Sequence, residues 1–115
     1  MANAGHLDIV RDRPGFWNDW RRRNSKVMPD FAGADLSEFN LAGANLSKAD
    51  FSGAKLAGAN LSGANLSRAK FFRADLSQAD LSRANLFKAN LSQADLAGIN
   101  LNCADLTGAC LIRAN

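Results

Sequence analysis

From residue 31 onward, an apolar residue recurs at every fifth position of the chain. Fourteen of these central residues are leucine and three are phenylalanine. From Leu36 on, the residue two before each centre is alanine except at Phe39 and Ile99. The residue directly before each centre is Asp or Asn except at Lys55, Lys70 and Cys110. The central residues are Phe31, Leu36, Leu41, Leu46, Phe51, Leu56, Leu61, Leu66, Phe71, Leu76, Leu81, Leu86, Leu91, Leu96, Leu101, Leu106 and Leu111.

A five-residue period fits neither of the two regular elements. On an α-helix, five residues advance by about 500°, so successive centres would lie roughly 140° apart and would form no stripe. On a β-strand, an odd spacing would send alternate centres to opposite faces. The pattern therefore predicts a backbone that turns once in every repeat. If each turn is close to a right angle, four repeats close one coil.

The three central phenylalanines test the length of this coil. Phe31, Phe51 and Phe71 are spaced by four repeats. A 20-residue coil would place their rings in one interior column. The sequence therefore predicts a stack of phenylalanines along the axis of the solenoid.

The two lysines that interrupt the Asp/Asn position give a second test. Lys55 is four repeats from both Asp35 and Asp75, and Lys70 is four repeats from Asp50. Unlike charges that face each other on adjacent strands are mildly stabilising. We therefore expect each lysine to lie beside a carboxylate of a neighbouring coil.

The repeat resembles the pentapeptide repeat family, whose motif is Ala-(Asp/Asn)-Leu-X-X, and the resemblance covers residues 31–115. Consecutive tandem repeats of this kind rarely arise by chance. Segments that match the motif include Ala34-Asp35-Leu36, Ala44-Asn45-Leu46, Ala59-Asn60-Leu61, Ala79-Asp80-Leu81 and Ala104-Asp105-Leu106. The resemblance implies an all-β solenoid, a right-handed quadrilateral β-helix of a little over four coils. The centre and the alanine would point inward, and the other three positions outward.

Glycine often follows the centre by two residues, as at Gly33 and Gly63. Glycine suits the positive φ of the third residue of a type II turn. Alternating leucine and alanine would fill a narrow interior without voids. The sequence thus divides into an N-terminal tail with a helix, 1–30, and a repeat domain, 31–115.

The segment before the repeat predicts a short helix over 14–23. Phe16, Trp17 and Trp20 would share one face of it, because they are three and four residues apart. We expect this face to cap the open end of the solenoid, with Phe39 filling space beneath it. The alternative is a tryptophan–arginine surface for nucleic acid or lipid.

The C-terminal repeats have no such segment after them, so the last coil would present an unpaired backbone edge. Three outcomes stay open. Two molecules could stack end to end as a homodimer. The chain could be a fragment of a longer repeat protein, or the short edge could remain in solvent.

The sequence offers little for catalysis. We expect His6, the single histidine, to lie in a mobile, solvated tail, where it cannot serve as a positioned base. Cys103 and Cys110 would be free thiols near different corners of the coil, which fits a reducing cytoplasm. We expect no catalytic residue, cofactor, metal or small-molecule substrate. No run of apolar residues is long enough to span a membrane.

One surface feature stands out. Lys48, Arg68 and Lys88 are spaced by four repeats, so they should form a basic column. We expect Phe72 and Phe87 to face solvent near one corner beside this column, because they stand where Ser or Ala is usual. Exposed aromatic residues beside cations can mark a partner site; the alternative is an ordinary solvated face. The candidate partner surface comprises Lys48, Arg68, Lys70, Phe72, Arg73, Phe87 and Lys88.

The function that best fits these features is a non-catalytic structural or protein-interaction module with an unknown protein partner. The resemblance offers one alternative, a DNA mimic that binds type II topoisomerases, and it implies a bacterial origin. Such mimicry needs a long acidic rod, whereas this chain has 115 residues and a net charge of +3. Nucleic-acid binding through Arg21, Arg22, Arg23 and the column is a further, weaker alternative, because +3 is a mild charge. An enzyme is the least supported class.

Overall fold

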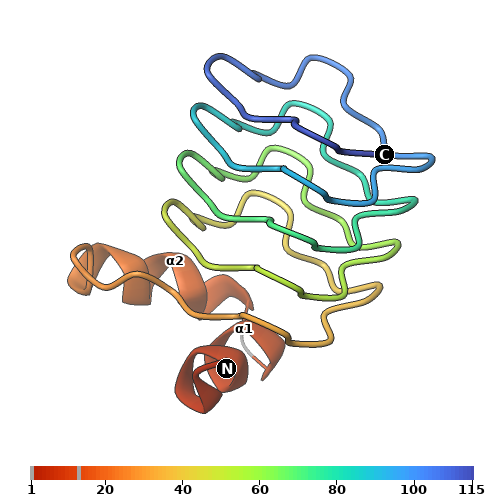
Figure 1. Cartoon of the computed structure of the whole chain (residues 1–115). Helices are drawn as coiled ribbons and strands as arrows, with labels where there is room; N and C mark the ends of the chain where they lie inside the picture. The colour runs from red at the N-terminus through yellow and green to blue at the C-terminus, as the bar shows by residue number, and fades with distance from the viewer. Residues whose placement is uncertain (1, 13) are drawn as a thin grey trace.

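The computed structural model describes residues 2–12 and 14–115 of the chain. Two short helices come first, α1 (Ala4–Asp12) and α2 (Pro14–Arg23). The rest of the chain winds upward as a stack of coils, and both helices lie at its N-terminal end (Figure 1). Within the described residues, the coils pair through isolated bridges rather than extended strands.

The coil closes after every four repeats, as predicted. Every bridge is parallel and joins residues four repeats apart, from Asp30 with Asp50 to Asn90 with Cys110. The same register governs the hydrogen bonds. The N–H of Leu36 donates to the carbonyl of Lys55 at 2.7 Å. Each repeat therefore lies directly below the repeat that comes four later.

Every repeat ends in a tight turn. The N–H of Ala34 donates to the carbonyl of Phe31 at 3.0 Å, and the same bond recurs along the solenoid. The second residue after each centre has a positive φ, whether it is Gly33 at 72° or Lys48 at 62°. A positive φ confined to this third turn residue is typical of type II, which confirms the predicted turn.

The Asp/Asn position stabilises the turn through its side chain. One oxygen of Asp80 accepts hydrogen bonds from the hydroxyl of Ser82 at 2.7 Å and from its N–H at 2.9 Å. These two bonds, the hydroxyl first, lower the pKa of Asp80 below its ordinary value. The pKa values of Asp75 and Asp105 are lowered in the same way. At Asp35 the N–H of Ser37 contributes most to the lowered pKa, and its hydroxyl comes second.

The lysines that replace Asp or Asn lie where the register predicts. The backbone of Lys55 forms β-bridges with Asp35 and with Asp75, and the backbone of Lys70 forms one with Asp50. Lys55 helps to lower the pKa of Asp35, although the bonds from Ser37 contribute more. Among residues 2–12 and 14–115, no lysine forms an ion pair with a carboxylate. The register thus places each lysine beside a carboxylate without a direct ion pair among the described residues.

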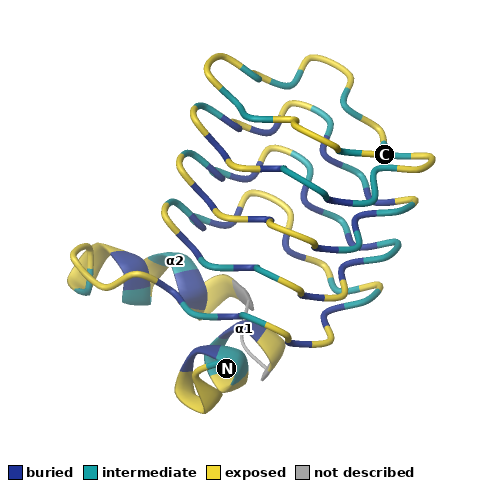
Figure 2. Ribbon diagram, viewed as in Figure 1, coloured by how far each residue is buried: buried dark blue, intermediate teal, exposed yellow. Residues whose placement is uncertain are grey.

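The interior is formed by buried apolar residues of successive coils. Figure 2 shows buried residues, in dark blue, recurring along the coils. The rings of Phe31 and Phe51 stack with centroids 5.3 Å apart, and those of Phe51 and Phe71 stack at 5.0 Å. This stack confirms the prediction from their spacing. The central leucines and the alanines between them are buried from the first coil to Ala94.

Trp17 joins the helices to the first coil. Its side chain is fully buried, its ring lies 5.5 Å from that of Phe31, and its Nε1–H donates to the carbonyl of Asn45 at 2.8 Å. Trp20 stacks on Trp17 at 5.2 Å. The prediction that Phe16 shares this face is wrong, because Phe16 is 50% exposed. Neighbouring residues on a helix point about 100° apart, so only one of Phe16 and Trp17 can face the coil.

The prediction that His6 lies in a solvated tail is also wrong. His6 belongs to α1, is only 7% exposed, and lies edge-on to Trp17, Trp20 and Phe31. Its Nδ1 accepts a hydrogen bond from the N–H of Asp30 at 3.0 Å. Burial lowers the pKa of His6, and the Arg21 charge adds to the effect, while Asp30 opposes it. Burial therefore favours the neutral form of the ring.

Arg21 and Arg22 do not form the open basic surface that the nucleic-acid interpretation requires. Arg21 is only 3% exposed, and its guanidinium donates to the carbonyls of Val27 at 2.6 Å and Ser47 at 3.2 Å. Arg22 pairs with Asp19. The contacts of Arg21 tie α2 to the first coil. Among the three described arginines, Arg23 is exposed and forms no ion pair.

The last coil is much less covered than the first. Leu101 and Leu106 are half-buried, whereas Leu111 is 45% exposed and Ile112 is 67% exposed. The exposure is visible in Figure 2 as yellow and teal along the coil that carries the C-terminus. The interior column thus reaches solvent at this end.

Candidate interaction surface

One corner of the solenoid carries the predicted basic column. Lys48, Arg68 and Lys88 occupy the same turn position in successive coils, with φ values of 62°, 60° and 56°. The N–H of Arg68 donates to the carbonyl of Phe87 at 2.7 Å, which fixes the register of the column. All three cationic side chains are exposed. The positive φ points the side chains at this turn position away from the interior.

Phe87 lies among these cations. The guanidinium carbon of Arg68 lies 5.8 Å from the centre of its ring, and the Lys88 ammonium lies 5.3 Å from it. Both distances are within the range of a cation–π interaction. Phe87 is half-buried. We call Lys48, Arg68, Phe87 and Lys88 the basic corner.

The side of the coil that follows the basic corner carries Lys70. Lys70 stacks above Asp50, which stacks above Asp30. Lys48, Asp50 and Lys70 contribute to the lining of a shallow hollow of about 190 Å³ on this side. The carboxylates of Asp30 and Asp50 already accept bonds from the N–H groups of their own turns.

Phe72 and Arg73 form a separate pair. The guanidinium of Arg73 lies 5.1 Å from the Phe72 ring and its Nε donates to Gln93 at 3.0 Å. Phe72 is 37% exposed, as predicted. The prediction that Phe72 and Phe87 lie near one corner is wrong. Phe72 lies in the turn that begins at Phe71. Phe87 lies one coil above the turn that comes just before that one, so the two phenylalanines stand at opposite ends of one side of the coil.

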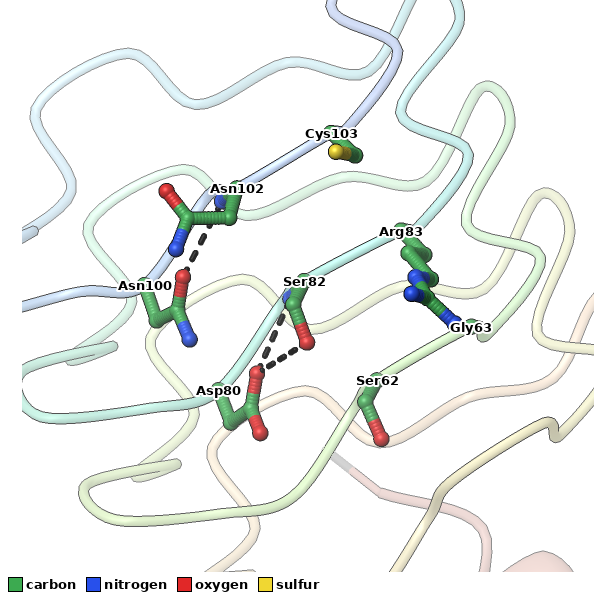
Figure 3. A pocket seen from close by; sticks show the side chains of 8 residues that line it. All are labelled: Ser62, Gly63, Asp80, Ser82, Arg83, Asn100, Asn102 and Cys103. Carbon is green, nitrogen blue, oxygen red and sulfur yellow. Dashed lines mark hydrogen bonds between the residues drawn. The ribbon is translucent and has the colours of Figure 1, made fainter.

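A larger hollow of about 570 Å³ opens on another side of the solenoid. Figure 3 shows Arg83 extending toward Gly63 of the coil below, with Asp80 bonded to Ser82. The lining residues are Ser62, Gly63, Asp80, Ser82, Arg83, Asn100, Asn102 and Cys103. The hollow is formed by the ordinary turn residues of the repeat, with glycine in place of a side chain at position 63.

Within the described ranges, no group of three or more His, Cys, Asp or Glu side chains is placed to hold a metal ion. Cys103 and Cys110 are both free, as predicted. In the same ranges, neither α1, α2 nor any other helix has the length and apolar character needed to cross a bilayer.

Sequence reasoning missed the residues that join the helices to the first coil. Asn18 accepts a bond from the N–H of Asn45 at 2.7 Å and donates to the carbonyl of Gly43 at 3.1 Å. His6 and Arg21 make comparable bonds. None of these residues belongs to a periodic pattern. The one available signal was their position in a helix just before the repeat.

Comparison with known proteins agrees with this architecture. A model described as Pentapeptide repeats matches eight copies, over residues 30–63, 49–86 and 79–115. No curated protein sequence matches the chain.

Three solved structures illustrate the likeness. HetL, a pentapeptide repeat protein involved in heterocyst differentiation regulation from the cyanobacterium Nostoc sp. strain PCC 7120, is 44% identical with a TM-score of 0.74, and the match covers 76% of this chain and 43% of HetL. A second pentapeptide repeat protein from Nostoc PCC 7120 is 40% identical with a TM-score of 0.59, over 80% of this chain and 71% of that one.

QnrB1, a plasmid-mediated fluoroquinolone resistance protein, is 20% identical with a TM-score of 0.50, over 75% of this chain and 59% of that one. At this identity the likeness concerns the fold alone. The repeat, the four-repeat register and the family match over residues 30–115 lead to one conclusion: the chain belongs to the pentapeptide repeat family.

Proposed function

We propose that the protein is a non-catalytic interaction module, a rigid solenoid that presents one side to a protein partner. The observation that carries the proposal is the arrangement of the basic corner and the Phe72–Arg73 pair. Two phenylalanines stand where the repeat ordinarily has Ser or Ala, and an arginine lies beside each, at 5.8 Å from Phe87 and 5.1 Å from Phe72. Aromatic residues and arginine are enriched at the centres of protein interfaces.

The rigidity of the scaffold supports this role. The candidate residues stand on turns that are held by hydrogen bonds to the coil below or above, such as Gly53 N–H to Phe72 at 2.9 Å. A preorganised surface loses little conformational entropy on binding. The likeness to HetL, which is involved in regulation, fits a role exerted through protein contacts. The chain spans less than half of HetL, so that role is proposed here for the module alone.

An affinity capture from native lysate tests the proposal. The wild-type chain, the double variant Phe72→Ser/Phe87→Ser and the control Phe16→Ser serve as baits. Phe16 is also substantially exposed but lies on α2. We expect one identified protein to be retained by wild type and by the control and lost from the double variant.

The captured protein is then purified and titrated calorimetrically against each bait. Loss of affinity by about tenfold or more for the double variant alone supports the proposal. Equal affinity for all three baits contradicts it. The melting temperature of each bait shows whether the double variant is folded.

We further propose that α1 and α2 act as a cap on a right-handed quadrilateral β-helix, with the cap in 1–30 and the repeat domain in 31–115. The support is the hydrogen bonding of the first coil. Asn45 accepts from Trp17 and donates to Asn18, and Asp30 accepts from the N–H of Asn3. These partners stand where a preceding coil would otherwise supply backbone groups.

A second copy of the chain is the partner that we propose for the last coil. The exposed Leu111 and Ile112 and the unpaired backbone N–H groups beside them, in the part of the chain that the structure describes, support end-to-end pairing. Sedimentation over a wide concentration range should show a dimer that Ile112→Arg disrupts. A monomer at every concentration would contradict it.

Topoisomerase binding by DNA mimicry is not the function that we propose, because the side with the basic corner carries more cations than carboxylates. We propose a reducing cytoplasm as the location, which the free thiols of Cys103 and Cys110 support.

A further inference from the structure

Within the described ranges, the cations around the basic corner are not engaged in ion pairs. Among the described residues, Lys48, Arg68, Lys70 and Lys88 form no ion pair and no side-chain hydrogen bond, and all four are exposed. The acidic residues of that side, such as Asp50, use their carboxylate oxygen in their own turn. The charge of the corner is therefore available to a ligand.

The column also has a regular spacing along the solenoid axis. Neighbouring coils lie about 4.8 Å apart, so the backbones of Lys48 and Lys88 are roughly 10 Å apart. An extended peptide in the polyproline II conformation rises about 3.1 Å per residue and completes one turn every three residues, so side chains at every third position share one face and lie roughly 9 Å apart. Carboxylates at every third position of such a peptide would meet cations of the column.

Phe87 makes the corner partly apolar. Its ring lies within cation–π distance of both Arg68 and Lys88, which orients both cations and leaves an aromatic surface beside them. Phe72 adds a second exposed ring at the far edge of the same side. A ligand that combines carboxylates with apolar side chains uses both features, whereas a bare polyanion uses only the charge.

The charge balance favours a peptide over a nucleic acid. The four cations Lys48, Arg68, Lys70 and Lys88 share this side with two carboxylates, Asp30 and Asp50. Proteins that bind duplex DNA by charge typically neutralise about six to ten phosphates. The corner offers fewer cations than this, and Asp30 and Asp50 would repel additional phosphates.

We propose that the basic corner binds an extended acidic segment of the partner protein, with carboxylates along Lys48, Arg68 and Lys88 and an apolar side chain against Phe87. This proposal rests on the interaction role proposed above and names the chemistry of the partner. It assigns binding to charge pairing along one corner rather than to the solenoid surface as a whole.

The test is fluorescence anisotropy with a labelled peptide that carries glutamate at every third position and leucine beside each glutamate. A peptide with lysine in place of glutamate and a labelled DNA duplex are the competing probes. The protein variants are Arg68→Glu and Lys88→Glu, each with a neutral counterpart, Arg68→Gln and Lys88→Gln. Arg83→Glu is the matched control.

Arg83 matches Arg68 in repeat position and in φ, which is 60° for both, and it is also exposed, but it stands on a different corner. We expect the acidic peptide to bind wild type and Arg83→Glu with affinities within about threefold. Arg68→Glu and Lys88→Glu should each weaken binding by about tenfold or more, and the glutamines by less. Added salt should weaken binding to wild type.

Three results would overturn the proposal: no binding of the acidic peptide, equal weakening by Arg83→Glu, or tighter binding of the duplex than of the peptide. These results are separable from failure of the interaction role. If a captured partner binds wild type, is lost from Phe72→Ser/Phe87→Ser and is retained by Arg68→Glu, the interaction role stands and the acidic segment does not.

Discussion

The two ends of the solenoid complete the same repeat in different ways. At the first coil, side chains of the helical segment bond to the backbone of Asn45, and Trp17 packs against Phe31. At the last coil, the N–H groups of Leu106 and Leu111 have no backbone acceptor in the described chain. The comparison teaches that the backbone hydrogen-bonding groups at an edge of this solenoid can be satisfied by side chains of a non-repeating sequence. Those side chains must match the spacing of a coil.

The covered end is itself only partly covered. Asp30 and Asn45 have partners from the helical segment, whereas the backbone N–H groups of Asp35 and Asn40 have none in the described chain. Asp30 and Asn45 lie on adjacent sides of the coil. The helical segment therefore supplies hydrogen-bond partners to the two sides that meet beneath the basic corner, and in the described chain it supplies none to the N–H groups of Asp35 and Asn40 on the other two sides.

The largest effect should come from Trp17→Ala. This change removes a fully buried side chain, its contact with Phe31 and its bond to Asn45. Buried aromatic-to-alanine changes cost about 3–5 kcal/mol. We expect a loss of about 4 kcal/mol in the free energy of unfolding, measured by urea denaturation.

The control for that experiment is Trp20→Ala, because Trp20 stacks on Trp17 but is only half-buried. It should cost less than half as much. If both changes cost the same, or if Trp17→Ala costs under about 1 kcal/mol, the helical segment contributes little to the first coil.

Asn18→Ala should have the next largest effect. The change leaves the N–H of Asn45 and the carbonyl of Gly43 without their partners. A partly buried group that loses its hydrogen bond costs about 1–3 kcal/mol. We expect a loss of about 2 kcal/mol by the same measurement, whereas the exposed Asn102→Ala should change stability by about 0.5 kcal/mol or less. Equal losses would show that the side-chain amide of Asn18 does not replace the hydrogen bonds that a preceding coil would make.

Acidification should weaken the covered end before it weakens the coils. Burial lowers the pKa of His6 below its ordinary value of 6.5, so the unfolded chain binds the proton more readily than the folded chain. Stability is therefore full above pH 6.5 and falls as the pH drops toward the lowered folded pKa. Tryptophan fluorescence during urea unfolding at a series of pH values measures the slope.

His6→Asn is the control, since its side-chain oxygen can replace Nδ1 as the acceptor for Asp30 and does not titrate. The variant should lose the slope that begins at pH 6.5. The lowered pKa values of Asp75 and Asp80 act with the same sign but only below their ordinary value of 3.8. A slope that persists in His6→Asn above about pH 5 would contradict the assignment to His6.

The coil could be predicted because each position of the repeat has a local physical role. The glycine at Gly33 indicates a positive φ, and the Asp or Asn before each centre bonds to its own turn, as Asp80 does. A five-residue period with right-angled turns then fixes the register of residues that are four repeats apart. Phe31 and Phe51 stack for this reason alone.

The helical contacts could not be predicted because they depend on the coil edge rather than on their own sequence. His6 looks like a tail residue until the N–H of Asp30 is placed beside it. The prediction that Phe72 and Phe87 lie near one corner failed for a related reason. The period gives the length of each side but does not say at which residues the corners lie, so two rings at successive corners were expected to lie at one.

The smallest effect, and the sharpest comparison of the two ends, should come from Leu111→Ala. Leu91 and Leu111 belong to the same interior column, but Leu91 is 1% exposed and Leu111 is 45% exposed. Leu91→Ala should cost about 3 kcal/mol, as is usual for truncating a buried leucine, and Leu111→Ala under about 1 kcal/mol. Urea unfolding at low protein concentration measures both.

If the last coil pairs with a second copy, the cost of Leu111→Ala should rise with protein concentration while that of Leu91→Ala stays constant, because only Leu111 would be buried by the association. A cost for Leu111→Ala near about 3 kcal/mol at every concentration would mean that the last coil is as well covered as the first, and the contrast between the two ends would fail.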